Sequence, residues 1–140
     1  AREQVGWDWF SLQLDDGRDL MVFRLRDAAG ATSATSGTLV ERDGTVVPLG
    51  ADDCRLEPGR AWRSPETGGR YPVRWRLAVP RVGLDLEVEA LLDAQENVSR
   101  RLPGLAYWEG AVMARRRGSG AEAGRGYLEM TGYGGDRLPM

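Results

Sequence analysis

The sequence predicts an all-β, antiparallel fold. Short runs of alternating apolar and polar residues recur along the 140 residues, separated by turn signals such as Asp-Gly and Pro-Gly. No segment has the periodicity of a convincing helix. About eight or nine such runs with short connections favour an up-and-down barrel or a sandwich, and a closed barrel of this size has room for one small ligand.

The first predicted element is a long β-hairpin, with arms Val5–Leu14 and Arg18–Asp27 joined by a short link that ends in Gly17. Each face of the first arm mixes bulky apolar and polar side chains, with Trp7, Trp9, Ser11 and Gln13 on one face and Asp8, Phe10, Leu12 and Leu14 on the other. This mixture predicts a sheet with a core on one side and a ligand or partner on the other. A buried hairpin whose aromatic residues are only core is the simpler interpretation.

The middle of the chain predicts a loop and two further hairpins. The segment Ala28–Ser36 is small and polar, which indicates a loop. The predicted strands that follow are Gly37–Glu41, Thr45–Leu49, Cys54–Leu56, Tyr71–Pro80 and Leu84–Ala90. In the third hairpin the apolar residues from Val73 to Val79 alternate with Arg74 and Arg76, which we expect to face carboxylates of the neighbouring strand on a solvated outer side.

The chain ends with an irregular segment and two predicted strands. The segment Leu91–Arg101 is polar and shows no alternation, and the strands Leu105–Arg115 and Gly126–Tyr133 follow it. In the last strand Tyr127, Glu129, Thr131 and Tyr133 are expected to share a face.

Composition excludes several kinds of chemistry. The chain contains no histidine and no lysine, and Cys54 is its one cysteine. These counts exclude a disulfide within the chain and a Cys-rich zinc site, and they remove the commonest general base and the commonest metal ligand, so we predict no metal site. A net charge of −2 gives no drive toward nucleic acid. No signal peptide or bilayer-spanning apolar run is visible, and the abrupt first strand suggests a piece of a longer protein.

Three carboxylates beside aromatic rings are the candidate chemistry-bearing groups. They are Asp8 between Trp7 and Trp9, Glu109 after Tyr107 and Trp108, and Glu129 near Tyr127. If they point inward, an apolar wall raises their pKa, so that a protonated carboxyl can act as a general acid on an alkene. Aromatic faces then stabilise the developing carbocation. The alternative is that these carboxylates form ion pairs inside the barrel with Arg24, Arg26 or Arg125.

Four segments in order resemble one protein family. They are GWDWFSLQLDDGRDLMVFRLR, WRSPETGGRYPVRWRL, YWEGAVMA and GRGYLEMTGYG. They are similar to the C-terminal part of the hydroxyneurosporene synthase and AttH-like family, which includes carotenoid 1,2-hydratases. The resemblance implies a lipocalin-like (calycin-type) barrel over residues 1–140, the second of two barrels in a longer bacterial protein.

The resemblance also implies a function. It predicts binding of an apolar terpenoid, carotenoid or polyketide-type ligand, with cofactor-free hydration or cyclisation in the full-length protein, or binding without turnover. It implies the missing N-terminal barrel as a partner, and a periplasmic, secreted or membrane-associated location. By match to the motifs, Asp8 and Glu109 are the candidate acids, and the candidate pocket residues are Trp7, Trp9, Gln13, Tyr107, Trp108, Tyr127 and Glu129.

Overall fold

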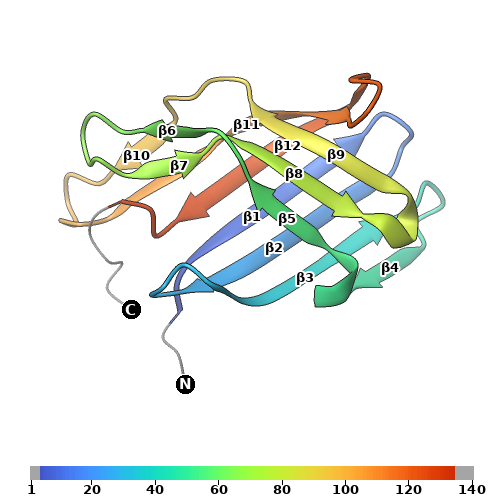
Figure 1. Ribbon diagram of the computed structural model, residues 1–140, viewed down its shortest axis with the longest axis horizontal. Helices are drawn as coiled ribbons and strands as arrows, with labels where there is room; N and C mark the ends of the chain where they lie inside the picture. Colours follow the sequence, from blue (N-terminus) through green and yellow to red (C-terminus); the bar gives the residue numbers. More distant parts are fainter. Residues whose placement is uncertain (1–3, 135–140) are drawn as a thin grey trace.

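The structure, a computed structural model, describes residues 4–134 and consists almost entirely of strands (Figure 1). Helix within this range is limited to two 3-10 turns, η1 (Ala51–Asp53) and η2 (Pro80–Val82), so none is long and apolar enough to cross a membrane. The strands are β1 (Gln4–Leu14), β2 (Asp19–Asp27), β3 (Thr32–Val40), β4 (Val46–Leu49), β5 (Arg55–Pro58), β6 (Ala61–Arg63), β7 (Arg70–Pro72), β8 (Arg74–Val79), β9 (Leu84–Ala90), β10 (Glu96–Val98), β11 (Ala106–Arg116) and β12 (Glu122–Thr131).

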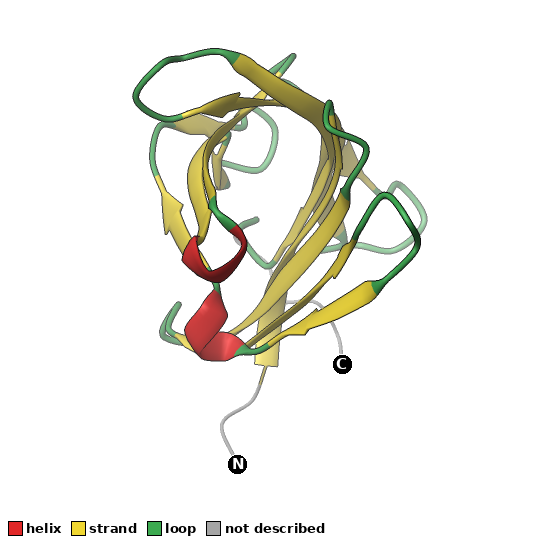
Figure 2. Ribbon diagram, turned by 90° about the vertical axis from the view of Figure 1, so that its right-hand side faces the viewer, coloured by secondary structure: helices red, strands yellow, loops and turns green. Residues whose placement is uncertain are grey.

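Most strands belong to one antiparallel sheet that curls around the core (Figure 2). Its order is β4-β3-β2-β1-β12-β11-β9-β8-β5, with β10 paired beside β11, while β6 and β7 form a separate small sheet. The first and last strands pair with each other, since Asp8 lies opposite Met130 and Leu12 opposite Gly126. The predicted all-β, lipocalin-like architecture is therefore confirmed.

The curled sheet is a half-barrel, because no hydrogen-bonded pairing joins its edge strands β4 and β5 in the described residues. Both edge strands are short, and each contains a proline, Pro48 or Pro58, which has no N–H to donate to a ladder. The 3-10 turn η1 connects β4 to β5 across this gap. An ion pair joins it to η2, with Arg81 Nη1 2.9 Å from Asp53 Oδ2. The lipocalin-like sheet is therefore open along one side.

The concave side of the sheet holds the hydrophobic core. Side chains from every second residue of β1, β8 and β11 fill it, and Phe10 packs edge-on against Trp75 with ring centroids 5.3 Å apart. Trp108 is fully buried among them, and its indole Nε1 donates to the Asp93 carbonyl at 2.7 Å. Alternation along each strand thus separates core from outer surface as a pleated sheet requires.

The outer side of β8 and β9 is charged, as the sequence predicts. Arg74 pairs with Glu87, and Arg76 Nε lies 3.1 Å from Asp85 Oδ1. These side chains are about one-third to one-half exposed, so each pair contributes little to stability.

Three local predictions are wrong. Most of the predicted loop Ala28–Ser36 lies in β3. Backbone pairing with β2 holds this segment as a strand, although its small side chains show no strand pattern. The strand predicted over Tyr71–Pro80 is divided at Val73 between two sheets. The irregular segment Leu91–Arg101 contains β10, which pairs with the first residues of β11.

Candidate functional site

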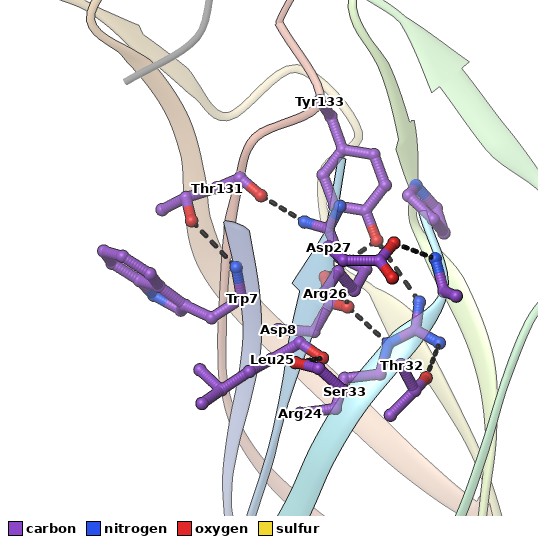
Figure 3. Close-up of polar contacts among 12 residues, drawn as sticks. Trp7, Asp8, Arg24, Leu25, Arg26, Asp27, Thr32, Ser33, Thr131 and Tyr133 are labelled. Carbon is purple, nitrogen blue, oxygen red and sulfur yellow. Dashed lines mark hydrogen bonds and ion pairs between the residues drawn. The ribbon is translucent and has the colours of Figure 1, made fainter. Parts of the chain in front are cut away.

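The Asp8 side chain is fully buried on the concave side of β1, where it accepts three hydrogen bonds (Figure 3). Its Oδ2 accepts from Arg24 Nε at 2.6 Å and from Arg26 Nε at 3.0 Å. Its Oδ1 accepts from the Tyr133 hydroxyl at 2.8 Å. The predicted alternative, an ion pair with Arg24 or Arg26, is therefore correct for Asp8.

The two arginines extend this cluster to neighbouring strands. Arg26 Nη2 donates to the carbonyl of Thr131 at the end of β12, and its guanidinium lies 3.9 Å from the centroid of the Tyr133 ring. The Arg24 guanidinium lies 4.9 Å from the centroid of Trp75. Both guanidinium groups therefore combine an ion pair with a cation–π contact.

Two glycines make the cluster possible. A Cβ on Gly6 would overlap the Thr131 carbonyl and lie 2.6 Å from Arg26 Nη2, so only glycine leaves room for that guanidinium. Gly132 has a φ of 82°, in the left-handed region that glycine adopts without strain. It ends β12 and turns the chain so that Tyr133 packs inward.

Tyrosines beside the cluster are held in their neutral form. Burial, and then the Asp8 carboxylate, raise the pKa of Tyr133 far above its usual value, so its hydroxyl donates to Asp8 as a neutral group. The Tyr71 ring lies 5.6 Å from that of Tyr133. Burial and the nearby Glu96 carboxylate also raise the pKa of Tyr71, although its buried hydroxyl has no hydrogen-bond geometry to any described residue.

The Asp8 cluster is an internal anchor and is poorly placed for chemistry on a ligand. Both carboxylate oxygens of Asp8 already accept hydrogen bonds from protein donors, and no part of the side chain is exposed. A ligand would therefore have to displace Arg24, Arg26 or Tyr133 to reach it. The cluster ties the first strand to the second strand and to the end of the last one.

The other two candidate carboxylates lie on the outer side of the sheet. Glu109 on β11 is directly opposite Glu129 on β12, and Glu129 is opposite Trp9 on β1. Tyr107 and Tyr127 occupy the neighbouring outer positions of β11 and β12. No described cation pairs with either glutamate. Like charges directly opposite each other repel, so the charge of Glu109 disfavours ionisation of Glu129.

The electrostatics of the pair follow from its surroundings. Partial burial, followed by the negative charge of Glu109, raises the pKa of Glu129, and a contact with the Trp7 side chain opposes the shift. Partial burial and the two glutamates also raise the pKa of Tyr127. The arrangement can hold a proton beside exposed aromatic rings.

The structure separates the predicted site residues into two groups. The prediction that Glu109 and Glu129 point inward with Asp8 is wrong. The outer group is Trp7, Trp9, Gln13, Tyr107, Glu109, Tyr127 and Glu129, and the inner group is Asp8 and Trp108. Alternation sorts residues into faces, but both faces of these strands carry aromatic residues, so the pattern does not indicate which one meets the core.

Tyr133 is the cluster residue whose position the sequence did not predict. It was expected to share a face with Tyr127, Glu129 and Thr131, but β12 ends at Thr131 and the chain then turns. The signal that could have shown this is Gly132, a glycine immediately before an aromatic residue at the end of a strand.

Pockets on the described part of the molecule include the following three. The first lies at one end of the sheet beside Thr67, Val98 and Leu105, with a volume of about 290 Å³. The second is lined by charged residues of two turns, and the third by the charged outer side of β8. The interior side chains of Phe10, Leu77 and Val112 line none of these three, whereas the buried Trp75 lines the third.

Residues 4–134 contain no group of three Cys, Asp or Glu side chains placed to hold a metal ion.

Replacing Glu129 by glutamine should stabilise the protein at neutral pH. The pKa of this carboxyl group is higher in the folded chain than its ordinary value of 4.5, so the folded state binds its proton more tightly than the unfolded state does. Stability is therefore lost as pH rises through the folded-state pKa. We expect the difference in urea unfolding free energy between variant and wild type to grow from near zero below pH 4.5 to a plateau above the folded-state pKa.

The matched control is Glu87→Gln on the charged outer side. Its hydrogen bond with Arg74 lowers the pKa of Glu87, so ionisation stabilises the folded state. This variant should lose stability relative to wild type as pH rises, the opposite sign. A Glu129→Gln difference that does not change with pH would contradict the shift.

A family model and one solved structure relate the chain to the same family. The family model described as AttH-like matches residues 1–133. A crystal structure of a protein from Nitrosomonas europaea that carries the AttH name is 39% identical, with a TM-score of 0.83 over 94% of this chain and 39% of that one. Kievitone hydratase from Nectria haematococca is 18% identical with a TM-score of 0.69, over 91% of this chain and 39% of that one, which shows a shared fold.

No functionally curated protein matches the chain. The chain spans about two-fifths of the length of each solved relative. The family model covers nearly every residue, and the curled antiparallel sheet is shared with both structures. This chain therefore belongs to the AttH-like family.

Proposed function

We propose that this lipocalin-like domain contributes the outer face of β1, β11 and β12 to an apolar-ligand site, at which the full-length protein catalyses cofactor-free hydration or cyclisation of an alkene. The observation that carries the proposal is the directly opposed pair Glu109 and Glu129, flanked by Trp9 and by two tyrosines. A raised pKa suits Glu129 to the role of proton donor.

The proposed reaction needs only these groups and water. Protonated Glu129 transfers its proton to one alkene carbon, and the carbocation left on the other carbon faces the rings of Trp7, Trp9 or Tyr127. Water adds to that carbon, and the proton it loses returns to the carboxylate pair, so alkene and water become an alcohol. In a cyclisation, a second double bond of the ligand attacks the carbocation in place of water, and the new carbocation loses a proton to the carboxylate pair, so that a ring with one double bond is left.

The fold of a named hydratase supports this class of reaction. Kievitone hydratase shares the fold of this chain, so hydration is compatible with such a scaffold. At 18% identity, no residue role is carried from that protein to this one. Binding of an apolar ligand without turnover is the second candidate, and the partly exposed rings of Trp7 and Tyr127 support it equally.

The test uses the full-length protein with an acyclic carotenoid in water labelled with oxygen-18. Wild type should yield a product heavier by one labelled water, and Glu129→Gln and Glu109→Gln should each reduce its formation by at least about tenfold, since one positioned acid or base typically contributes 10² or more. The control Glu57→Gln, an exposed carboxylate on the edge strand β5, should leave the rate unchanged.

Binding is measured separately with the neutral apolar dye Nile red. If the carotenoid displaces the dye from wild type but not from Trp7→Ala, and wild type forms no hydrated product, the result supports the binding function and contradicts catalysis. Dye binding that is insensitive to Trp7→Ala contradicts both.

A further inference from the structure

The pocket of about 290 Å³ lies at one end of the molecule, where the turn between β6 and β7 meets β10 and the start of β11 (Figure 1). Its lining comes from that turn through Glu66 and Thr67, from the opposite side through Val98 and Leu105, and from the chain after β12 through Gly134. Its volume is at the lower end of the range for sites that bind small organic molecules. This pocket takes no part in the reaction proposed above.

Hydrogen bonds fix the polar wall of the pocket. The buried Ser64 hydroxyl accepts from the backbone N–H groups of Glu66 and Thr67. The same hydroxyl donates to the carboxylate of Glu96, and the Thr67 hydroxyl donates to the other oxygen of that carboxylate at 2.7 Å. The wall is therefore in place before a ligand arrives, which reduces the entropy that binding costs.

The pocket has a negatively charged side and an apolar side. Alternate residues of a strand share a face, so the Glu96 carboxylate faces the same way as Val98, which lines the pocket. Neither Glu66 nor Glu96 pairs with a cation among the residues that the structure describes. The side chains of Val98, Leu105 and Ala106 are apolar. A matching ligand therefore has a positive charge at one end and an apolar body.

A buried hydroxyl group next to the pocket has no partner. Tyr71 is 0% exposed, and its hydroxyl forms no hydrogen bond with any described residue. A Cβ built on Gly134 would lie 3.7 Å from this hydroxyl and 3.5 Å from the Cβ of Ala106, so glycine leaves no side chain between the hydroxyl and the pocket. Burial, and then the Glu96 carboxylate, raise the pKa of Tyr71, so its hydroxyl stays neutral. An unpaired buried hydroxyl is costly, and a ligand atom that pairs with it recovers that cost.

We propose that this pocket binds a small primary alkylammonium ion, with its nitrogen between the carboxylates of Glu66 and Glu96 and the hydroxyl of Tyr71. An ammonium group has three N–H donors, which match two carboxylates and the oxygen of a neutral tyrosine. The alkyl chain lies on the apolar side of the pocket, against Val98 and Leu105. An alcohol of the same length offers one donor and no charge, and a carboxylate is repelled by the two glutamates.

The test is isothermal titration calorimetry of the full-length protein at neutral pH with three probes of equal chain length: hexylammonium chloride, 1-hexanol and sodium hexanoate. Hexylammonium should bind at least about tenfold more tightly than 1-hexanol, because hydrogen bonds between charged groups are the stronger ones. Hexanoate should not bind. Equal affinities for hexylammonium and 1-hexanol would identify a merely apolar cavity and overturn the proposal, and so would the absence of hexylammonium binding.

Two variants locate the bound probe. Gly134→Ala adds a methyl group in ordinary contact with its neighbours, so the protein should fold as before, but the methyl group takes up space beside the Tyr71 hydroxyl and should weaken hexylammonium binding at least about tenfold. Tyr71→Phe removes the unpaired hydroxyl, so it should be at least as stable as wild type in urea and bind hexylammonium about tenfold more weakly.

The matched controls are Gly50→Ala and Glu57→Gln, neither of which lines this pocket, and both should bind hexylammonium as wild type does. Unchanged affinity in either Gly134→Ala or Tyr71→Phe would overturn the proposal, because the probe would then lie elsewhere. If Tyr71→Phe fails to fold, Gly134→Ala alone decides the outcome.

Discussion

Replacing Asp8 by alanine should lower the free energy of unfolding by about 3–5 kcal/mol, because removing one partner of a buried ion pair leaves the other charge uncompensated. Here two guanidinium groups lose their shared carboxylate at once. The Arg26 side chain is 5% exposed and that of Arg24 is 11% exposed, so water cannot replace Asp8 without rearrangement. Tyr133 would also lose the acceptor of its hydroxyl.

The measurement is urea unfolding at neutral pH, with Asp85→Ala as the matched control. Asp85 also pairs with an arginine, Arg76, but its side chain is 46% exposed. Breaking that pair should cost at most about 1 kcal/mol. Equal losses in the two variants would show that the Asp8 cluster is not an anchor.

A double variant tests the cause of the loss. If the penalty arises from an unpaired buried charge, then Asp8→Ala combined with Arg26→Met should be more stable than the sum of the two single changes predicts. If the penalty arises only from a cavity, the loss of unfolding free energy in the double variant should equal or exceed the sum of the two single losses. The double-mutant cycle therefore distinguishes electrostatic anchoring from simple packing.

The fold was predictable because strand alternation and turn signals are local. The Arg74 and Arg76 pairs with their neighbours on β9 follow from a hairpin, and so does the long first hairpin of β1 and β2. In contrast, β3 contains Ala34, Thr35 and Ser36, which do not alternate between large apolar and polar side chains. Their structure comes from pairing with β2, which no local pattern reports.

The candidate site was only half predictable for a related reason. Alternation correctly placed Glu129 on one face with Tyr127, but it could not show which face is concave. The Asp8 cluster depends on Tyr133, which is 125 residues away in sequence and is brought close by the pairing of the first and last strands. A contact between residues so far apart in sequence can be predicted only when the order of the strands in the sheet is known. The partners Arg24 and Arg26, in contrast, lie on the adjacent strand of a predicted hairpin.

Replacing Gly6 by alanine should destabilise the protein by about 3 kcal/mol, although it adds only one methyl group. Overpacking a rigid site costs about 1–3 kcal/mol, and losing a hydrogen bond to a charged donor costs about 1.5–3 kcal/mol. Both effects apply here, because the added Cβ would overlap the Thr131 carbonyl and lie 2.6 Å from Arg26 Nη2. The methyl group therefore separates the donor from its acceptor.

The matched control is Gly50→Ala, where the nearest atom to the added Cβ is Asp53 Oδ2 at 3.7 Å, an ordinary contact. Gly50 has a φ of −92°, which any residue adopts, so this change should be nearly neutral in urea unfolding. If Gly6→Ala is equally neutral, then Arg26 does not need the space beside β1. If Gly6→Ala is destabilising, and if Arg26→Met in the same protein reduces the loss of stability, then the side chain of Arg26 requires the space beside Gly6. The Gly-Trp-Asp-Trp segment then begins with glycine because the Arg26 side chain, which pairs with Asp8, occupies that space.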